Sequence, residues 1–288
     1  MAPVSEKNVT KLTLKNTATE KEPLSGTLTD GFTLIEMAIV LIIITLVVGS
    51  ALVPLGAQIE QRRRSETQKT LDEIKEALIG YALANNALPC PSRVNTAGIP
   101  DGYAIPNSDP TTPPNPNIVC GYDTTQPYPQ ILTGYIPWVT LGVNNHDAWG
   151  NLIRYAVDIK FTPTPTPTPP YPLPATPFSL TTTGNITIQS RNTAGAPTTI
   201  STNIPAAVLS LGKNGYGALS ADFIAQSSVP ASNTDEKQNI ASGSLTYFSR
   251  TPAPSGTSAT IGGEFDDTVV WISPNILFNR MVAAGKLP

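Results

Sequence analysis

Residues 31–57 read GFTLIEMAIVLIIITLVVGSALVPLGA, and from residue 37 onward they form an almost unbroken apolar run of 21 residues. At about 1.5 Å per helical residue, such a run spans the hydrocarbon core of a bilayer, which is about 30 Å thick. A cleaved secretory signal would have a shorter apolar region, followed by a cleavage site of small residues. The run therefore predicts a membrane-spanning helix that precedes a large C-terminal part.

One carboxylate, Glu36, stands at the head of this run. An acidic side chain costs roughly 2.5 to 3.5 kcal/mol at the bilayer centre and less near a helix end, so a tolerated interfacial Glu is one interpretation. The string GFTLIEM, residues 31–37, resembles the processing motif of type IV pilins and of the pseudopilins of type II secretion. This resemblance implies that a prepilin peptidase cuts after Gly31 and methylates the new N-terminus, Phe32. It also implies that Glu36 is the assembly carboxylate, which the α-amino group of a neighbouring Phe32 neutralises inside a bundle of subunits.

The resemblance further implies a pilin-like α+β fold. In this fold a long N-terminal helix, first transmembrane and then amphipathic, packs on an antiparallel β-sheet head. The chain would be a single-pass protein of the inner membrane, and its partners would be the prepilin peptidase, other pilin-like subunits and assembly platform proteins. The expected segments are a cleaved cytoplasmic leader (1–31), the transmembrane half of the helix (32–57), its amphipathic half (58–86) and a periplasmic β-rich head (87–288).

The charges that flank the span favour the opposite orientation. Arg62, Arg63 and Arg64 follow the apolar run, whereas the four lysines of the leader are balanced by four acidic residues. Counting positive charges would therefore place the C-terminal side in the cytoplasm. We expect a periplasmic head all the same, because the peptidase motif lies on the cytoplasmic side in this family. The two cysteines also favour an oxidising compartment.

The helix is expected to continue beyond the apolar run. Leu71, Ile74, Leu78 and Tyr81 follow the spacing of one apolar stripe, and Asn85, Asn86 and Pro89 are expected to end the helix. Charges of both signs balance on the other faces, so the three arginines are expected to contact lipid headgroups or neighbouring subunits rather than nucleic acid. Within the span, Gly49 and Pro54 permit a bend or local unwinding.

The head is expected to consist of short β segments separated by Pro, Gly and Asn turns. GKNGYG, residues 212–217, is typical of a hairpin turn and lacks the spacing of a phosphate-binding loop. A run crowded with Pro and Thr, residues 162–177, is expected to form an extended polyproline II excursion on the surface. The candidate strands are Leu152–Ile159, Leu180–Ile188, Ala206–Leu211 and Thr268–Ile272.

Cys90 and Cys120 are the two cysteines of the chain, and they bracket a segment rich in Pro, Asn and Asp. In an oxidising compartment a disulfide between them is the expected state, and two buried free thiols are the alternative. Closing a loop of this length stabilises the fold by roughly 3 to 4 kcal/mol in the chain-entropy model.

Two further groups of residues in the head are candidate sites. DAWGNLIRYAV, residues 147–157, resembles the Asp-x-Trp-Gly-Asn segment that leads into a sheet strand in major pseudopilins. Acidic residues near the C-terminus could supply oxygen ligands for a structural Ca²⁺, as in some major pseudopilins, although solvated turn carboxylates are the simpler interpretation. The candidate ligands are Asp235, Glu264, Asp266 and Asp267.

Composition excludes several functions. A formal net charge of −3, from 18 basic and 21 acidic residues, provides no field for gathering nucleic acid. A single His and two Cys make a His-centred triad or a His/Cys metal site improbable, so no catalytic residues and no other cofactor are expected. The predicted function is that of a pseudopilin in a homo- or hetero-polymeric secretion filament, which helps to move exoproteins across the outer membrane. The alternatives are a minor type IV pilus subunit for adhesion, motility or DNA uptake, and a membrane-tethered periplasmic binding module.

Overall fold

The computed structural model describes residues 31–95, 98–105, 118–120, 122–123, 130–163, 178–253 and 261–287, with the side chains of residues 50–55 left out. The expected leader up to residue 30 and residues 164–177 of the Pro/Thr-rich run lie outside this description. The chain divides into two compact units, Met1–Pro54 and Leu55–Pro288.

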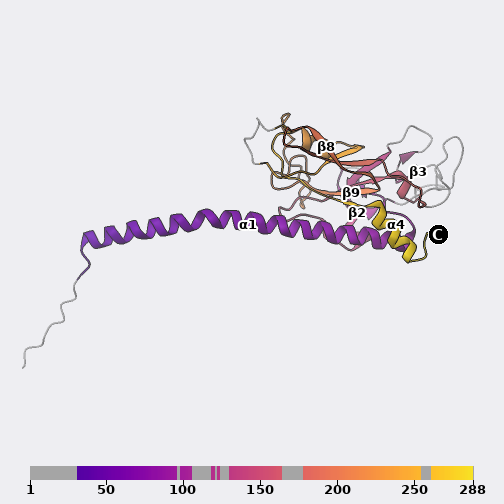
Figure 1. Ribbon diagram of the computed structural model, residues 1–288. Coiled ribbons are helices and arrows are strands. Elements are labelled where there is room, and N and C mark those ends of the chain that lie inside the picture. Colours follow the sequence, from indigo (N-terminus) through magenta and orange to yellow (C-terminus); the bar gives the residue numbers. More distant parts are fainter. Residues whose placement is uncertain are drawn as a thin grey trace, which may run out of the picture. The chain divides into compact units, whose positions relative to one another are not determined.

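The longest element is helix α1, Leu34–Asn85, with 52 residues (Figure 1). It ends where the sequence predicts, because Asn86 adopts a left-handed φ of 58° and donates its backbone N–H to the carbonyl of Ala82. The backbone remains helical through Gly49 and Pro54, so the bend expected there stays a prediction. In the described ranges of the chain, no helix has both the length and the apolar character needed to cross a membrane.

In the second unit, α1 buries one face. Leu71, Ile74 and Leu78 are fully buried and Tyr81 is partly buried, which confirms the stripe predicted from their spacing. The stripe packs against a four-stranded antiparallel sheet with the strand order β11-β9-β6-β5. Its strands are β5 (Ile131–Tyr135), β6 (Arg154–Asp158), β9 (Ala206–Ser210) and β11 (Thr268–Ile272).

A second sheet covers the other face of the first. It has the order β10-β7-β8, made of β7 (Ile186–Arg191), β8 (Pro197–Ile204) and β10 (Thr246–Phe248). β7 and β8 form an antiparallel hairpin, whereas β10 runs parallel to β7. The sequence predicted antiparallel pairing, and the parallel pair differs because a long connection through β8, β9 and a short helix separates β7 from β10.

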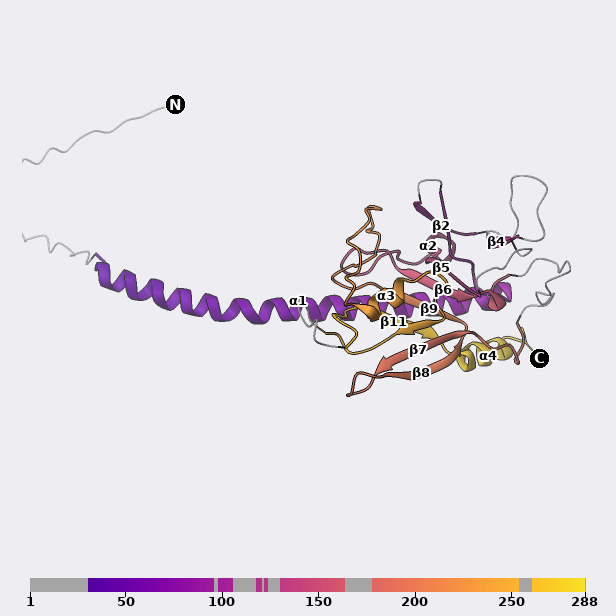
Figure 2. The same cartoon turned by 90° about the horizontal axis from the view of Figure 1, so that it is seen from above.

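The head therefore has three layers, with the four-stranded sheet in the middle (Figures 1 and 2). Successive side chains of a strand point to opposite faces, so each strand of the middle sheet feeds two cores. Tyr155 and Val157 of β6 join the core under α1, whereas Ala156 joins the core under the second sheet. Both faces are covered at β9, which explains why all five of its residues are buried.

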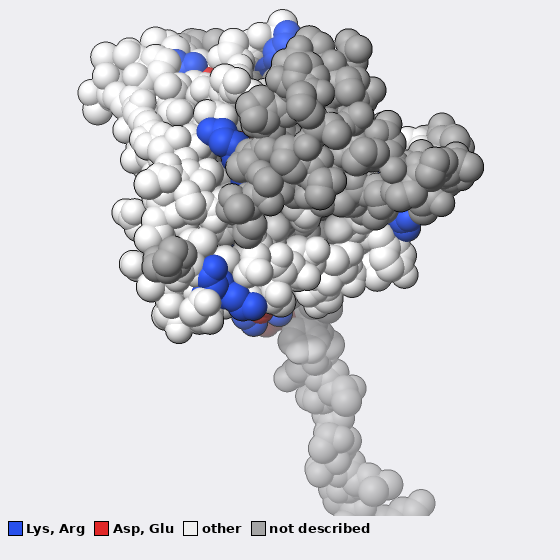
Figure 3. Space-filling model, turned by 90° about the vertical axis from the view of Figure 1, so that its right-hand side faces the viewer, with Lys and Arg blue, Asp and Glu red and all other residues white. Residues whose placement is uncertain are grey.

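The remaining elements lie at the ends and edges of these layers. Helix α4, Pro274–Ala283, begins after Ser273 and buries Leu277 and Met281 in the core under α1. One face of the molecule shows few charged side chains, as the low charge content of the sequence leads one to expect (Figure 3). The other elements are β1 (Ser92–Val94), β2 (Pro100–Ala104), β3 (Ile118–Val119), β4 (Tyr122–Asp123), α2 (Trp138–Leu141), η1 (Ile159–Phe161) and α3 (Thr234–Ile240).

Three of the four predicted strands correspond closely to β6, β9 and β11, and two predictions need correction. The segment predicted as Leu180–Ile188 becomes β7 only from Ile186, because Ser179 and Thr182 form a turn through their side chains. GKNGYG does not join two paired strands, because the neighbours of β9 in the sheet are β6 and β11. It forms instead a loop that reaches the acidic residues of the head.

Candidate assembly site and polar network of the head

The start of α1 holds the predicted processing and assembly residues together. Gly31, Phe32 and Thr33 precede the first helical residue, and the Phe32 side chain is 78% exposed. Glu36 accepts hydrogen bonds at Oε2 from the backbone N–H and the hydroxyl of Thr33, both at 2.8 Å. In return, the Glu36 N–H donates to the Thr33 hydroxyl at 3.3 Å. These residues form a capping box, a Thr-x-x-Glu signal that was present in the sequence and was missed in the prediction.

The helix that follows this box presents uncovered apolar side chains. Leu34 and Leu46 are 89% and 71% exposed, and the other large apolar side chains through Val48 are exposed as well. An apolar surface of this extent is unfavourable in water and is characteristic of a surface that contacts a membrane or other protein. Glu36 is the acidic residue at the head of this surface, where it also complements the partial positive charge of the helix N-terminus.

The three arginines that follow the apolar run differ in their surroundings. Arg62 and Arg63 are exposed, and Arg64 pairs with Glu60 one helical turn earlier, at 3.2 Å. Lys213 of the GKNGYG loop approaches the same carboxylate at 3.7 Å. Arg64 therefore has a partner within its own chain, whereas Arg62 and Arg63 face outward and could meet headgroups or neighbouring subunits.

The DAWGN segment fastens α1 to the middle sheet. The buried carboxylate of Asp147 accepts from the N–H groups of Trp149 and Asn151 at 2.9 Å and from the Ser210 hydroxyl of β9 at 2.6 Å. Burial raises the pKa of Asp147, and these hydrogen bonds oppose the rise. The next backbone N–H, of Ala148, donates to the buried Thr67 of α1. The segment leads into β6, as its resemblance to major pseudopilins predicted.

The disulfide between Cys90 and Cys120 is present, with a Cα–Cα distance of 5.4 Å and a sequence separation of 30 positions. Both side chains are buried in the core under α1. This confirms the predicted bridge and removes the alternative of two free thiols.

Reduction of this disulfide is expected to lower the free energy of unfolding by about 3 to 4 kcal/mol, because it releases loop-closure entropy to the unfolded chain. The measurement is denaturant unfolding of the full chain with and without a thiol reductant. The reduced wild type is the right comparison because it keeps both buried side chains. A Cys90→Ala, Cys120→Ala double variant, insensitive to reductant, serves as the control, and a reductant effect below about 1 kcal/mol in the wild type would contradict the prediction.

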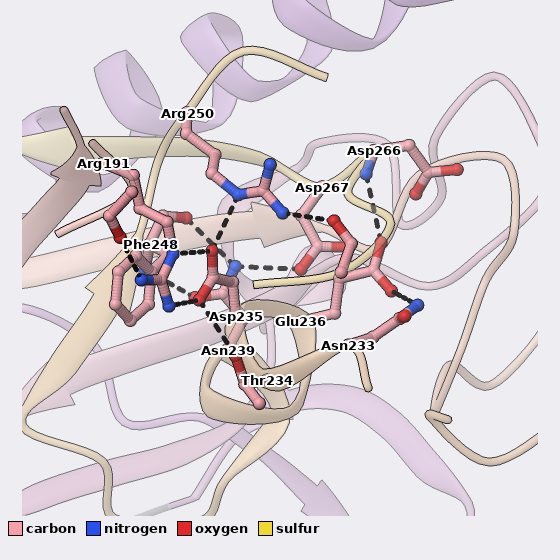
Figure 4. A network of polar contacts seen from close by, with 12 residues as sticks. Arg191, Asn233, Thr234, Asp235, Glu236, Asn239, Phe248, Arg250, Asp266 and Asp267 are labelled. Atoms are coloured by element: carbon pink, nitrogen blue, oxygen red, sulfur yellow. Dashed lines mark hydrogen bonds and ion pairs between the residues drawn. The ribbon is translucent and has the colours of Figure 1, made fainter. Parts of the chain in front are cut away.

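The four acidic residues proposed as calcium ligands do not gather at one point. Asp235, on α3, is fully buried between Arg191 and Arg250. Arg191 donates to both of its carboxylate oxygens, and the Nε of Arg250 lies 2.7 Å from Oδ2 (Figure 4). Glu264 and Asp266 line a hollow together with Glu60 and Arg64, and Asp235 is not among the described residues that line it.

A different trio of carboxylates does come together. Glu236, Asp266 and Asp267 each offer an oxygen within 4.8 Å of the others. Glu236 was missed in the prediction, because a charged residue in a short helix gives no sign that the fold will bury it. Asn214 of the GKNGYG loop donates to Glu236 through its side chain and to Asp266 through its backbone.

The chain itself already supplies donors to most of this trio. Glu236 accepts at Oε1 from Asn214 and from the backbone of Asp266, and at Oε2 from Asn233. Asp267 accepts from Asn239 (Figure 4), while Oδ1 of Asp266 is buried without a partner among the residues that the structure describes. A cation would therefore have to use the remaining oxygens, so the fit to Ca²⁺ is partial.

Burial also changes the proton affinity of these carboxyl groups. It raises the pKa of Glu236, brings that of Asp266 to about 7, and places that of Asp267 well above its ordinary value. The proximity of other acidic groups adds to the rise for each of them. Protons bound by these carboxyl groups can thus reduce the negative charge of the cluster, as a bound cation would.

Comparison of the chain with protein-family models, with curated proteins and with solved structures found no match in any of the three. The fold is that of an α+β protein whose sheets are antiparallel except for the β7–β10 pair.

Proposed function

We propose that this protein is a pilin-like filament subunit of the pseudopilin type. A prepilin peptidase removes the leader after Gly31, and the mature chain begins at a methylated Phe32. The residues from 37 to 57 hold it in the inner membrane, with the head in the periplasm, until subunits assemble through their N-terminal helices. The filament then helps to move exoproteins across the outer membrane.

The main support is the exposed carboxylate of Glu36, which stands two residues into α1 and directly before a series of uncovered apolar side chains. A helix used only as a tether needs apolar residues and no acid. In a bundle of such helices a carboxylate is unfavourable unless a cation neutralises it, and the α-amino group made by cleavage at Gly31 provides one. Charge pairing between subunits would therefore fix their register.

The rest of the chain is compatible with this role. The second half of α1 is fixed to the head by its apolar stripe and by the Thr67 contact to the DAWGN segment. The boundary between the two compact units falls at Pro54, inside the helix. A Pro lacks the N–H that would bond to the preceding turn, which favours a change in helix geometry when a subunit leaves the bilayer.

The test is the N-terminal sequence and intact mass of the protein purified from its own membranes, with and without the host's prepilin peptidase. We expect a chain that begins at methylated Phe32 when the peptidase is present and at Met1 when it is absent. A chain that begins at Met1 in both strains would overturn the proposal.

A matched control is available at the cleavage position. A side chain added at Gly31 meets no atom within 4 Å, so Gly31→Leu should leave the fold of the precursor intact. We expect this variant to keep its leader in the presence of the peptidase. Efficient cleavage of Gly31→Leu would show that the cut is made elsewhere.

A further inference from the structure

A pocket of about 320 Å³ with both polar and apolar walls lies against the turn that joins β7 to β8. Arg191 at the end of β7 and Arg250 after β10 both line it, together with the hydroxyl-bearing residues Thr193 and Thr251. No acidic residue is among the described residues that line this pocket. Its polar surroundings are thus cationic and hydrogen-bonding, which is the character of an anion site.

Hydrogen bonds, ion pairs and aromatic rings fix the positions of the two arginine side chains. Both guanidinium groups converge on the carboxylate of Asp235 (Figure 4). Arg191 also donates Nη1–H to the Gly195 carbonyl, and Arg250 donates Nη2–H to the Gly263 carbonyl, each at 2.7 Å. Phe248 lies under the Arg191 guanidinium and Phe265 under that of Arg250. Two such groups, fixed by packing, lose little freedom when a ligand binds.

The charge at this point is incompletely balanced. Two guanidinium groups share one carboxylate, which leaves one positive charge in excess at the pocket. Arg250 uses Nε toward Asp235 and Nη2 toward the Gly263 carbonyl, and its Nη1 has no hydrogen-bond partner among the described residues. An anion in the pocket would accept from the Nη1–H groups, which no described residue uses.

Other acidic groups near α3 do not remove this excess. Glu236 and Asp267 hydrogen-bond to Asn233 and Asn239, and neither of them lines the pocket. Burial raises the pKa of both carboxyl groups.

We propose that this pocket binds the oxyanion group of a small ligand, a carboxylate or a phosphate, through the guanidinium groups of Arg191 and Arg250. The flat fork of Arg matches the geometry of both oxyanions. The hydroxyl groups of Thr193 and Thr251 provide further donors at the rim. The site is independent of the filament role, since it lies entirely in the head.

The experiment is a thermal-unfolding titration of the full chain in detergent, followed by tryptophan fluorescence. Phosphate, acetate and chloride are compared at constant ionic strength. We expect a saturable rise in the unfolding temperature with phosphate or acetate and none with chloride, and the stronger of the two identifies the preferred oxyanion. Equal effects of all three salts would overturn the proposal.

Two variants tie the effect to the pocket. Thr193→Glu places a carboxylate at the rim, where it competes with the ligand, and Thr199→Glu puts the same charge on exposed β8 outside the pocket. We expect the apparent Kd to weaken by about tenfold or more in the first and to stay unchanged in the second. Equal affinities of the two variants would contradict the assignment.

Arg250→Lys retains a positive charge beside Asp235 and removes the fork. We expect it also to weaken the apparent Kd by about tenfold, and unchanged affinity would overturn the role of the guanidinium. If this variant does not fold, the comparison of the apparent Kd values of Thr193→Glu and Thr199→Glu still tests whether the pocket binds the anion.

Discussion

Replacing Glu36 by alanine is expected to reduce incorporation into sheared filaments by about a hundredfold or more, while membrane insertion is retained. In the proposed filament, the substitution would leave the α-amino group of a neighbouring Phe32 unpaired among apolar helices, and breaking a buried ion pair in this way costs about 3 to 5 kcal/mol. About 1.4 kcal/mol corresponds to a factor of ten, so the loss exceeds two orders of magnitude. The readout is the amount of protein in the sheared fraction relative to the membrane fraction.

Glu36→Gln separates the charge of this residue from its capping role. A glutamine at this position can still accept from Thr33 in a capping box, but it cannot neutralise an ammonium group. We therefore expect Glu36→Gln to be as defective as Glu36→Ala. The matched control is Glu73→Ala, which removes an exposed acid of α1 that pairs with Lys69. Normal incorporation of Glu36→Gln would reduce the role of Glu36 to helix capping, and normal incorporation of Glu36→Ala would favour a simple tether.

The sequence predicted those elements whose apolar residues repeat with the period of a helix or form a short apolar run typical of a buried strand. The stripe on the second half of α1 is one example, and β9 and β11 are others. Strand β8 was not predicted. Seven of its eight residues are exposed or partly exposed, so its sequence shows no alternation of apolar and polar residues. Helix α4 was missed although its signals were present, namely Ser273 and Pro274 at the start and Leu277 and Met281 one turn apart.

Some candidate sites can be recognised from residues close together in the sequence, whereas others are formed by residues that only the fold brings together. The GFTLIEM string and the Cys90–Cys120 pair depend on residue types that stand out along the chain. The network around Asp235 could not be predicted, because its two arginines come from β7 and from the segment after β10. Glu236 and Asp267 are buried only because asparagines from other parts of the fold satisfy them, and no sequence pattern reports such a partner in advance.

The carboxyl cluster should make the stability of the head fall as the pH rises. In the folded protein the pKa of Asp266 is raised from 3.8 to about 7, chiefly by burial and then by Glu236 and Glu264. Because the folded protein binds this proton more tightly than the unfolded chain does, the stabilising contribution is fully present below about pH 4, where both states are protonated. That contribution is lost as the pH rises through about 7. A pKa that is higher by one in the folded state corresponds to about 1.4 kcal/mol, so the whole effect is on the order of a few kcal/mol.

Asp266→Asn is expected to flatten this pH dependence, because an amide does not titrate, whereas Asp222→Asn on the exposed surface should leave it unchanged. Denaturant unfolding from pH 4 to pH 8, with a chelator present, gives the comparison. Equal dependence of the free energy of unfolding on pH in wild type and Asp266→Asn would contradict the prediction.

Repeating the pH 8 measurement with Ca²⁺ tests the cation alternative. Because an ion would replace the lost proton among the same oxygens, Ca²⁺ binding at this cluster would restore stability to the wild type and not to Asp266→Asn. Stabilisation of both proteins to the same extent would place any calcium site elsewhere.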